Sequence, residues 1–354
     1  MNSAHTSIGD QRQQLVQRLF PNGIPTLWCP ALTHYADDGA IDQARTRTHL
    51  RSMHPWVQGF LIPGSTGEGW DMSDAQVREL LVFMIDEMRS LRAHLLIGIL
   101  KTNIGDARQA MQDTITWLKQ RTSTTDAFES LAKSSVCGFT VCPPSGNALS
   151  QEQIRTALEE LLSLDLPMSL YQLPQVTQNE MSPETVAALA ARFPNFYLLK
   201  DTSGTDRVAA SGFRDVFLVR GAEGKYAGHL VAGGGNYNGF LLSTANCFAR
   251  QLSEMIQNLE RGNKEEAAAF SDRLTALCAE VFDLAGKVGY GSAFTNANKA
   301  MDHFFAHGPG AAKLPAPRLH SGQRLPTELI EAAGAALKRH GLMPEAGYLG
   351  AASP

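Results

Sequence analysis

Short apolar segments alternate with longer amphipathic segments along most of the chain. The apolar segments predict eight strands, at 24–29, 58–63, 94–100, 137–142, 167–173, 196–200, 216–220 and 238–243. Several are apolar nearly throughout, which is typical of parallel strands buried on both faces. Eight strands separated by helices predict an α/β fold, a (β/α)8 TIM barrel. The competing architecture is a doubly wound open sheet, but its glycine-rich phosphate turn does not follow the first strand.

The amphipathic segments carry recognisable helix start and stop signals. A helix is expected over 73–92, with Ser73 or Asp74 as N-cap, and another over 182–193, opened by Ser182. The pattern is helical again from 246 to 305 and near 327–340, while the polar stretch 119–135 predicts a surface insertion. The expected organisation is an N-terminal extension over 1–20, the barrel over 21–245, additional C-terminal helices over 246–340 and a loose tail over 341–354.

Composition and charge exclude several classes of partner. The formal net charge is -4, which gives no electrostatic reason to expect nucleic acid or an anionic membrane. No apolar run approaches the ~18–20 residues needed to span a bilayer, and the N-terminus lacks the apolar segment of a signal peptide. The five cysteines form no CxxC pair, so buried free thiols in a reducing compartment are expected. These features predict a cytoplasmic protein with no nucleic-acid or membrane partner.

Lys200 ends the sixth predicted strand, the end at which barrel active sites lie. It follows four apolar residues, and lysine is almost never fully buried without a partner. An apolar setting favours the neutral form of an amine, which is the nucleophile. The alternatives are a lysine whose ammonium reaches solvent, or one paired with Asp201. The position at the barrel mouth favours chemistry.

Two other strand ends carry polar side chains. The second strand ends in the segment 64–68, in which backbone amides and the hydroxyls of Ser65 and Thr66 can form a nest for a carboxylate or phosphate. A helix N-cap turn is an equally good reading of this segment alone. On the fifth strand, Tyr171 can move protons, although a core tyrosine is the stronger reading when it is taken alone.

At these three places the chain resembles the dihydrodipicolinate synthase / N-acetylneuraminate lyase family. The segment 64–68 matches the GSTGE box, and 171–174 matches the YNxP segment with Gln172 at the usual asparagine. Residues 199–204 match the strand that carries the Schiff-base lysine. Weaker matches follow at 221–223 and 239–246, and the resemblance runs in order from about residue 20 to 340. Together these matches are specific, although each is only moderately so.

The resemblance implies a (β/α)8 barrel that assembles as a homotetramer or homodimer and forms an imine with pyruvate or another 2-oxo acid. It implies that Lys200 forms this imine and that Tyr171 is the proton shuttle. It also implies a set of substrate-binding positions, namely Gly64, Ser65, Thr66, Gly221, Leu241 and Glu223. No cofactor is required, and no metal is expected, because the imine itself serves as the electron sink.

Departures from the family pattern bear on the substrate. Ser145 stands where the synthases have a tyrosine, and 173–177 lacks their arginine, which argues against dihydrodipicolinate synthase proper. The sialic-acid lyases have an acidic pair of which only Glu223 is present. Trp70 either packs in the core, the favoured reading, or lines the pocket.

The expected function is therefore a Schiff-base-forming lyase or aldolase that acts on a 2-oxo acid together with an aldehyde, whose identity stays open. Two alternatives remain. One is a sugar-acid dehydratase that uses the same imine. The other is a barrel that binds a 2-oxo acid or sugar acid without converting it, but binding alone needs no nucleophile.

Overall fold

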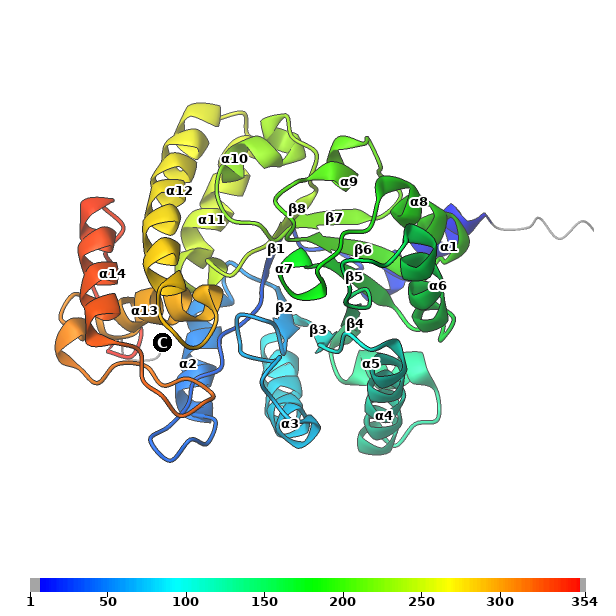
Figure 1. Cartoon of the computed structure of the whole chain (residues 1–354), viewed down its shortest axis with the longest axis horizontal. Helices are drawn as coiled ribbons and strands as arrows, with labels where there is room; N and C mark the ends of the chain where they lie inside the picture. The colour runs from blue at the N-terminus through cyan, green and yellow to red at the C-terminus, as the bar shows by residue number, and fades with distance from the viewer. Residues whose placement is uncertain (1–6, 351–354) are drawn as a thin grey trace, which may run out of the picture. The chain divides into compact units, whose positions relative to one another are not determined.

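The computed structural model describes residues 7–350 of the chain. Eight strands form a closed barrel in the order β1 to β8, as Figure 1 shows, so the predicted fold class is confirmed. The strands are β1 (Leu27–Cys29), β2 (Gly59–Ile62), β3 (His94–Ile99), β4 (Val136–Val141), β5 (Met168–Gln172), β6 (Phe196–Asp201), β7 (Phe217–Arg220) and β8 (Gly239–Leu241). Each overlaps a segment predicted from the apolar pattern.

The chain divides into two compact units. The first consists of Met1–Thr26, His94–Ala222 and Asn236–Leu241, and therefore carries β3 to β8. The second consists of Leu27–Ala93, Glu223–Gly235 and Leu242–Pro354, and combines β1 and β2 with the C-terminal helices. The domain boundaries expected from the sequence separate the barrel from the C-terminal helices. These two units instead group the elements by their contacts with one another.

In the first unit, parallel strands alternate with helices. The helices are α1 (Ile8–Leu19), α4 (Ile104–Thr122), α5 (Ala127–Lys133), α6 (Gln151–Leu162), α7 (Pro174–Thr177), α8 (Pro183–Arg192) and α9 (Arg207–Ala210). As predicted, Ser182 caps α8, whose first residue is Pro183. The polar stretch 119–135, predicted as a surface insertion, contains the end of α4 and a short helix, α5, which Asp126 caps. Figure 1 shows α6 and α8 side by side.

The N-terminal helix α1 is held to this unit by a buried arginine. Ser7 opens the helix with a capping box. Arg12 donates from Nε to the carbonyl oxygen of Phe196 at 2.7 Å, and from Nη1 to that of Asp215 at 3.1 Å. Its Nη2 reaches the carbonyl oxygen of Phe193 at 3.2 Å. The predicted N-terminal extension is therefore tied to the backbone at the beginning of β6.

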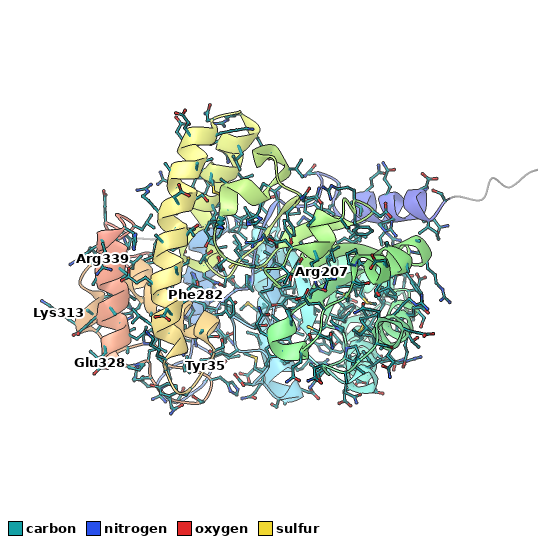
Figure 2. All side chains as sticks on the ribbon, turned by 45° about the horizontal axis from the view of Figure 1, so that its top comes forward. Tyr35, Arg207, Phe282, Lys313, Glu328 and Arg339 are labelled. Carbon is teal, nitrogen blue, oxygen red and sulfur yellow. The ribbon has the colours of Figure 1, made fainter. Side chains whose placement is uncertain are left out.

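The second unit is built around four long C-terminal helices. Its helical elements are α2 (Gln43–Met53), α3 (Asp74–Leu91), α10 (Tyr226–His229), η1 (Val231–Gly233), α11 (Ala245–Glu260), α12 (Lys264–Gly286), α13 (Ala293–His307), η2 (Ala311–Lys313) and α14 (Thr327–Arg339). Figure 2 shows Lys313, Glu328 and Arg339 at its surface, where all three are exposed. The opposite side of α14 buries Leu329 and Leu337, so the helix is amphipathic.

Close packing also sets the pairing of β1 with β2. Trp28 is opposite Gly59 in the ladder. A Cβ on Gly59 would lie 2.3 Å from the Trp28 ring, so glycine leaves the space that the indole fills.

The expectation of a loose tail is wrong for the described part of 341–354. The backbone amides of Tyr348 and Leu349 donate to the carbonyl oxygens of Phe305 and Ala306, at 2.9 and 3.0 Å. The segment therefore packs along α13, and residues 351–354 lie outside the described residues. The tail is rich in small residues and has no regular apolar pattern, so its sequence did not predict these contacts.

Two smaller expectations can also be compared with the structure. All five cysteines are buried free thiols, as predicted. Within residues 7–350, no helix is both long and apolar enough to cross a membrane.

Replacing Arg12 by methionine tests the attachment of α1. Arg12→Met should lower the free energy of unfolding by about 2–4 kcal/mol, because several buried carbonyl oxygens lose a charged donor. The matched control is Arg18→Met, at an exposed arginine of the same helix that stacks on Phe128, and it should cost no more than ~1 kcal/mol. Urea denaturation followed by circular dichroism measures both, and equal effects would contradict this role for Arg12.

Candidate active site

Lys200 and Tyr171 lie against each other in the first unit. Both end adjacent parallel strands, and they are direct partners in the ladder between β5 and β6. Nζ of Lys200 lies 3.9 Å from the centroid of the Tyr171 ring. The two residues are 3% and 2% exposed. The predicted nucleophile and the predicted proton shuttle are therefore neighbours in a largely buried setting.

The alternative readings of Lys200 do not hold. Its side chain is buried, so the ammonium does not reach outward to solvent. Asp201 instead accepts hydrogen bonds from the Ser203 amide and the Tyr237 hydroxyl, both at 2.9 Å. Burial, followed by the Asp201 carboxylate, raises the pKa of Tyr237, which keeps its hydroxyl protonated as a donor. Tyr237 was not among the predicted site residues, although it lies in an unusually glycine-rich loop.

Gly221 and Leu241 also lie beside Lys200. A Cβ on Gly221 would lie 3.0 Å from Cε of Lys200 and 2.3 Å from Oγ1 of Thr202. The carbonyl oxygen of Leu241 would lie 3.4 Å from the same point. A side chain at 221 would therefore collide with the Thr202 hydroxyl and crowd the lysine, which explains why glycine follows β7 here. The structure brings these two predicted residues together with Lys200.

The thiol of Cys142, just after β4, faces the same region. Burial raises its pKa to about 12, and the charge of Lys200 partly offsets this effect. A thiol with so high a pKa stays protonated near neutral pH and is a weak nucleophile.

The segment 64–68 is a turn in the second unit, and it is not a helix N-cap. Helix α3 begins later, at Asp74, and its N-cap is Ser73. Oγ of Ser65 accepts a hydrogen bond from Nε1 of Trp70 at 2.9 Å. The tryptophan, which the sequence left between packing and pocket lining, therefore holds the predicted carboxylate-binding serine.

Further contacts from α13 hold this turn. Thr295 donates from Oγ1 to the carbonyl oxygen of Thr66 at 3.2 Å. Glu68, which is buried with a φ of 64°, forms an ion pair with Lys299. Its other oxygen accepts from the backbone amide of His320 at 2.7 Å. No motif in the sequence points to Lys299 as a partner of Glu68, because 231 residues separate the two.

Glu223 is engaged by hydrogen-bond donors of its own unit. It accepts from Oγ of Ser243 at 2.6 Å, from the amide and hydroxyl of Thr244 at 3.1 and 2.8 Å, and from the Tyr226 hydroxyl at 2.9 Å. A carboxylate has about four acceptor positions. Glu223 therefore holds the turn after β8, and its contact with the substrate stays a prediction.

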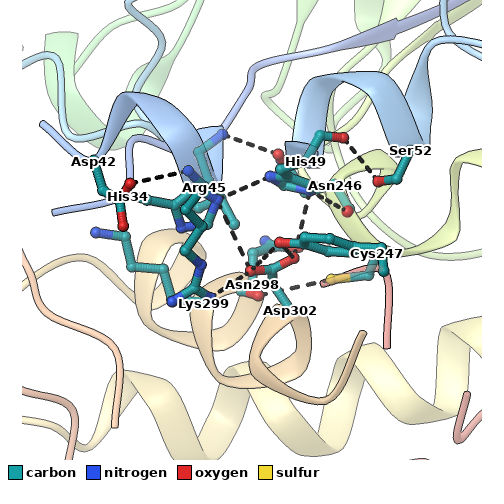
Figure 3. Close-up of polar contacts among 12 residues, drawn as sticks. His34, Asp42, Arg45, His49, Ser52, Asn246, Cys247, Asn298, Lys299 and Asp302 are labelled. Carbon is teal, nitrogen blue, oxygen red and sulfur yellow. Dashed lines mark hydrogen bonds and ion pairs between the residues drawn. The ribbon is translucent and has the colours of Figure 1, made fainter. Parts of the chain in front are cut away.

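One group of potential metal ligands occurs within residues 7–350, and Figure 3 shows it. It consists of His34, His49 and Asp302, all buried in the second unit, and their sequence spacing gave no hint of it. Nε2 of His34 lies 3.0 Å from Nδ1 of His49. Nε2 of His49 lies 2.8 Å from the carbonyl oxygen of Asn246. Since a carbonyl only accepts, this nitrogen carries a proton and is a donor.

The carboxylate of Asp302 is occupied as well. It forms an ion pair with Arg45 at 3.1 Å and accepts from the Tyr348 hydroxyl at 3.0 Å. A fixed cation on the carboxylate and a ring nitrogen used as donor do not suit a metal site, whose ligands must be deprotonated. These residues fit a closed hydrogen-bond network, and we assign no metal role to them. That no metal takes part stays a prediction.

Comparisons with known proteins agree on one family. A sequence model of the Dihydrodipicolinate synthetase family matches residues 25–288. A 4-hydroxy-tetrahydrodipicolinate synthase from Dehalococcoides mccartyi is 26% identical over 259 residues, 71% of this chain and 79% of the relative.

Solved structures show the same fold. Dihydrodipicolinate synthase from Bacillus anthracis has a TM-score of 0.69 at 18% identity, covering 88% of this chain and 97% of that one. A prophage protein of the dihydrodipicolinic acid synthase family from E. coli K12, solved in complex with pyruvate, has a TM-score of 0.67 at 19% identity. It covers 89% of this chain and 98% of its own.

The buried network around Asp302 predicts a loss of stability in mild acid. Burial, followed by the charges of Arg45, His49 and Lys299, lowers the pKa of His34 well below 6.5. As pH falls below about 6.5, the unfolded chain therefore takes up this proton before the folded protein does, and folding loses free energy. The free energy of unfolding should decline between about pH 7 and pH 5 in urea titrations.

Two variants test the assignment of this loss to the network. In His34→Gln the decline should be shallower, although His303, whose pKa burial lowers to about 4, contributes in the same direction. The control is Thr33→Val, which removes a buried hydrogen bond to Gly67 without removing a titrating group. It should lower stability equally at every pH, and a His34→Gln curve parallel to wild type would rule out His34 as the source.

Proposed function

Because the chain belongs to the dihydrodipicolinate synthetase family, we propose that it is a Schiff-base-forming lyase or aldolase that uses Lys200 to attack a 2-oxo acid. The observation that carries this proposal is the contact between the buried amine of Lys200 and the ring of Tyr171. A buried lysine whose amine forms no ion pair with residues 7–350 is costly unless the amine has a use. Pyruvate is the first substrate to test, since a relative of the same fold was solved with it.

The proposed reaction begins with attack by the neutral amine on the carbonyl carbon. The resulting carbinolamine loses water, and we propose that Tyr171, whose ring contacts the lysine amine, transfers the protons that this step moves. The imine then acts as an electron sink, so that a C–C bond to the neighbouring carbon breaks or forms. Gly221 keeps the space that the lysine chain needs for these changes.

We propose that Gly64, Ser65 and Thr66 bind the carboxylate of the 2-oxo acid. Support comes from the family box and from the turn itself, whose serine and threonine are held by Trp70 and Thr295. A binding loop that is fixed before the substrate arrives loses little freedom on binding. We propose that the second substrate is an aldehyde. Its identity stays open, because Ser145 stands where the synthases have a tyrosine.

We further propose a cytoplasmic location and assembly as a homotetramer or homodimer. The five free cysteines support a reducing compartment. The assembly is inferred from the family resemblance, and analytical ultracentrifugation of the purified chain would show a monomer if this inference is wrong.

Trapping with borohydride tests the imine. Reduction in the presence of pyruvate should leave a reduced pyruvate adduct on Lys200, located by peptide mass mapping, because borohydride converts an imine to a stable amine. Lys200→Ala should abolish the adduct while the protein stays folded. Lys225→Ala, at an exposed lysine of the second unit, is the control and should label normally. If neither pyruvate nor longer 2-oxo acids and sugar acids label Lys200, the chain is not an enzyme of this class.

Replacing Tyr171 tests proton transfer separately. Tyr171→Phe should still form some adduct but turn over about 10²-fold more slowly, the scale of lost general acid–base catalysis. The matched control is Tyr197→Phe, on β6, whose hydroxyl donates to the carbonyl oxygen of Cys137 at 3.1 Å. That change should cost stability and leave turnover near normal. Steady-state kinetics with the active substrate decides, and near-normal turnover of Tyr171→Phe would refute its role.

A further inference from the structure

Three small residues lie side by side on the strand face that carries Lys200. Gly98 pairs with Thr140 between β3 and β4, and Thr140 pairs with Ser169 between β4 and β5. Partners in parallel strands point to the same side, and so do residues two apart in a strand. Ser169 therefore shares its face with Tyr171. The small residues lie about 7 Å from the level of Tyr171, towards the amino ends of the strands.

The hydroxyl groups in this patch lack partners. Oγ1 of Thr140 and Oγ of Ser169 form no hydrogen bond with any residue in the range 7–350. Both residues are completely buried. Buried hydroxyls in native proteins are nearly always satisfied, either by protein groups or by ordered water, because an unsatisfied one is costly.

The patch also differs from its surroundings in size. Ser169 pairs on its other side with Leu198 of β6, and Leu198 pairs with Phe217 of β7. The same face therefore carries bulky side chains from the next strand onwards. Barrel interiors are normally filled by branched side chains. Gly98 adds no side chain here. A small, polar, buried space with a donor and an acceptor on each of two hydroxyls is what a single water molecule requires.

We propose that Thr140 and Ser169 bind a water molecule between them, and that this water supplies the hydrolysis of the Lys200 imine. The second half rests on the proposed function. Forming the imine expels one water, and releasing the product consumes one, at a residue that is almost closed to solvent. A bound water one step along the same face keeps this reactant within the barrel.

The hydrolytic step balances with this single water. Its oxygen forms a bond to the imine carbon while the electron pair of the C=N double bond moves to nitrogen. The proton that the water loses passes to Nζ of Lys200 by way of the Tyr171 hydroxyl. The remaining O–H proton follows to nitrogen as the C–N bond breaks, which yields the carbonyl product and the free amine.

The sign of the change in melting temperature tests the water site without reference to activity. If water joins the two hydroxyls, Thr140→Val and Ser169→Ala each lose a hydrogen bond and should lower Tm. The double variant should lower Tm by less than the sum, since one water serves both. If the hydroxyls are dry, each variant removes an unsatisfied group and should raise Tm, which would overturn the proposal.

The rate of imine hydrolysis tests the role of this water. The pyruvate imine is formed, the protein is diluted, and the remaining imine is trapped with borohydride at intervals. Thr140→Val and Ser169→Ala should each slow the loss of imine about tenfold, within the range of proton-transfer effects. Ser130→Ala is the control, because it removes a buried hydroxyl that donates to the carbonyl oxygen of Ala127 in α5, and its hydrolysis rate should match wild type.

The two experiments separate the possible failures. Unchanged hydrolysis in both variants would overturn the catalytic role of the water while the trapping result keeps the proposed function. If wild type forms no adduct with pyruvate or other 2-oxo acids, the proposed function and the hydrolytic role both fail. The Tm shifts then still decide for or against the water site.

Discussion

The ladder between β5 and β6 sets the contact between Lys200 and Tyr171 in the first unit. Tyr171 and Lys200 are partners in that ladder, and the amine lies over the tyrosine ring. Side chains alternate along a strand, so a shift of one residue would turn Lys200 to the opposite face. That face carries Leu170 and Leu199, which are buried and apolar. The register therefore decides whether the lysine meets a group that can transfer protons or a hydrophobic layer.

The strand register also brings the backbone at Gly221 close to the side chain of Lys200. A Cβ on Gly221 would lie 3.0 Å from Cε of Lys200 and 2.3 Å from Oγ1 of Thr202, so glycine leaves room for both side chains. Asp201 points to Ser203 and Tyr237, so it does not neutralise the amine. The lysine is thus confined by packing, and its amine forms no ion pair with the residues that the structure describes.

In the second unit, buried charges serve to hold loops. Glu68 with Lys299 fixes the turn at 64–68, and Glu223 is held by four donors around the turn after β8. Separating the partners of a buried ion pair leaves a charge without compensation, which is energetically costly. These contacts therefore constrain the backbone strongly. The network around Asp302 follows the same rule, with Arg45 and Tyr348 as its partners.

Local pattern determined much of this protein. The apolar segments predicted all eight strands, and Ser73 and Ser182 marked helix starts, because strand burial and helix capping depend on residues close in sequence. The motifs around Lys200, Tyr171 and residues 64–68 indicated the family that the comparisons support. What remained undetermined was which distant residues would hold each other.

Tertiary structure decided those partners. Nothing near Glu68 in the sequence points to Lys299, and Asp302, on α13, meets His34 and His49 only in the folded second unit. The same holds for Tyr348, because the segment expected to be a loose tail is hydrogen-bonded to α13. Strand and helix signals are local because they depend on neighbouring residues, whereas buried ion pairs and orphaned hydroxyls depend on register and packing between segments far apart in the chain.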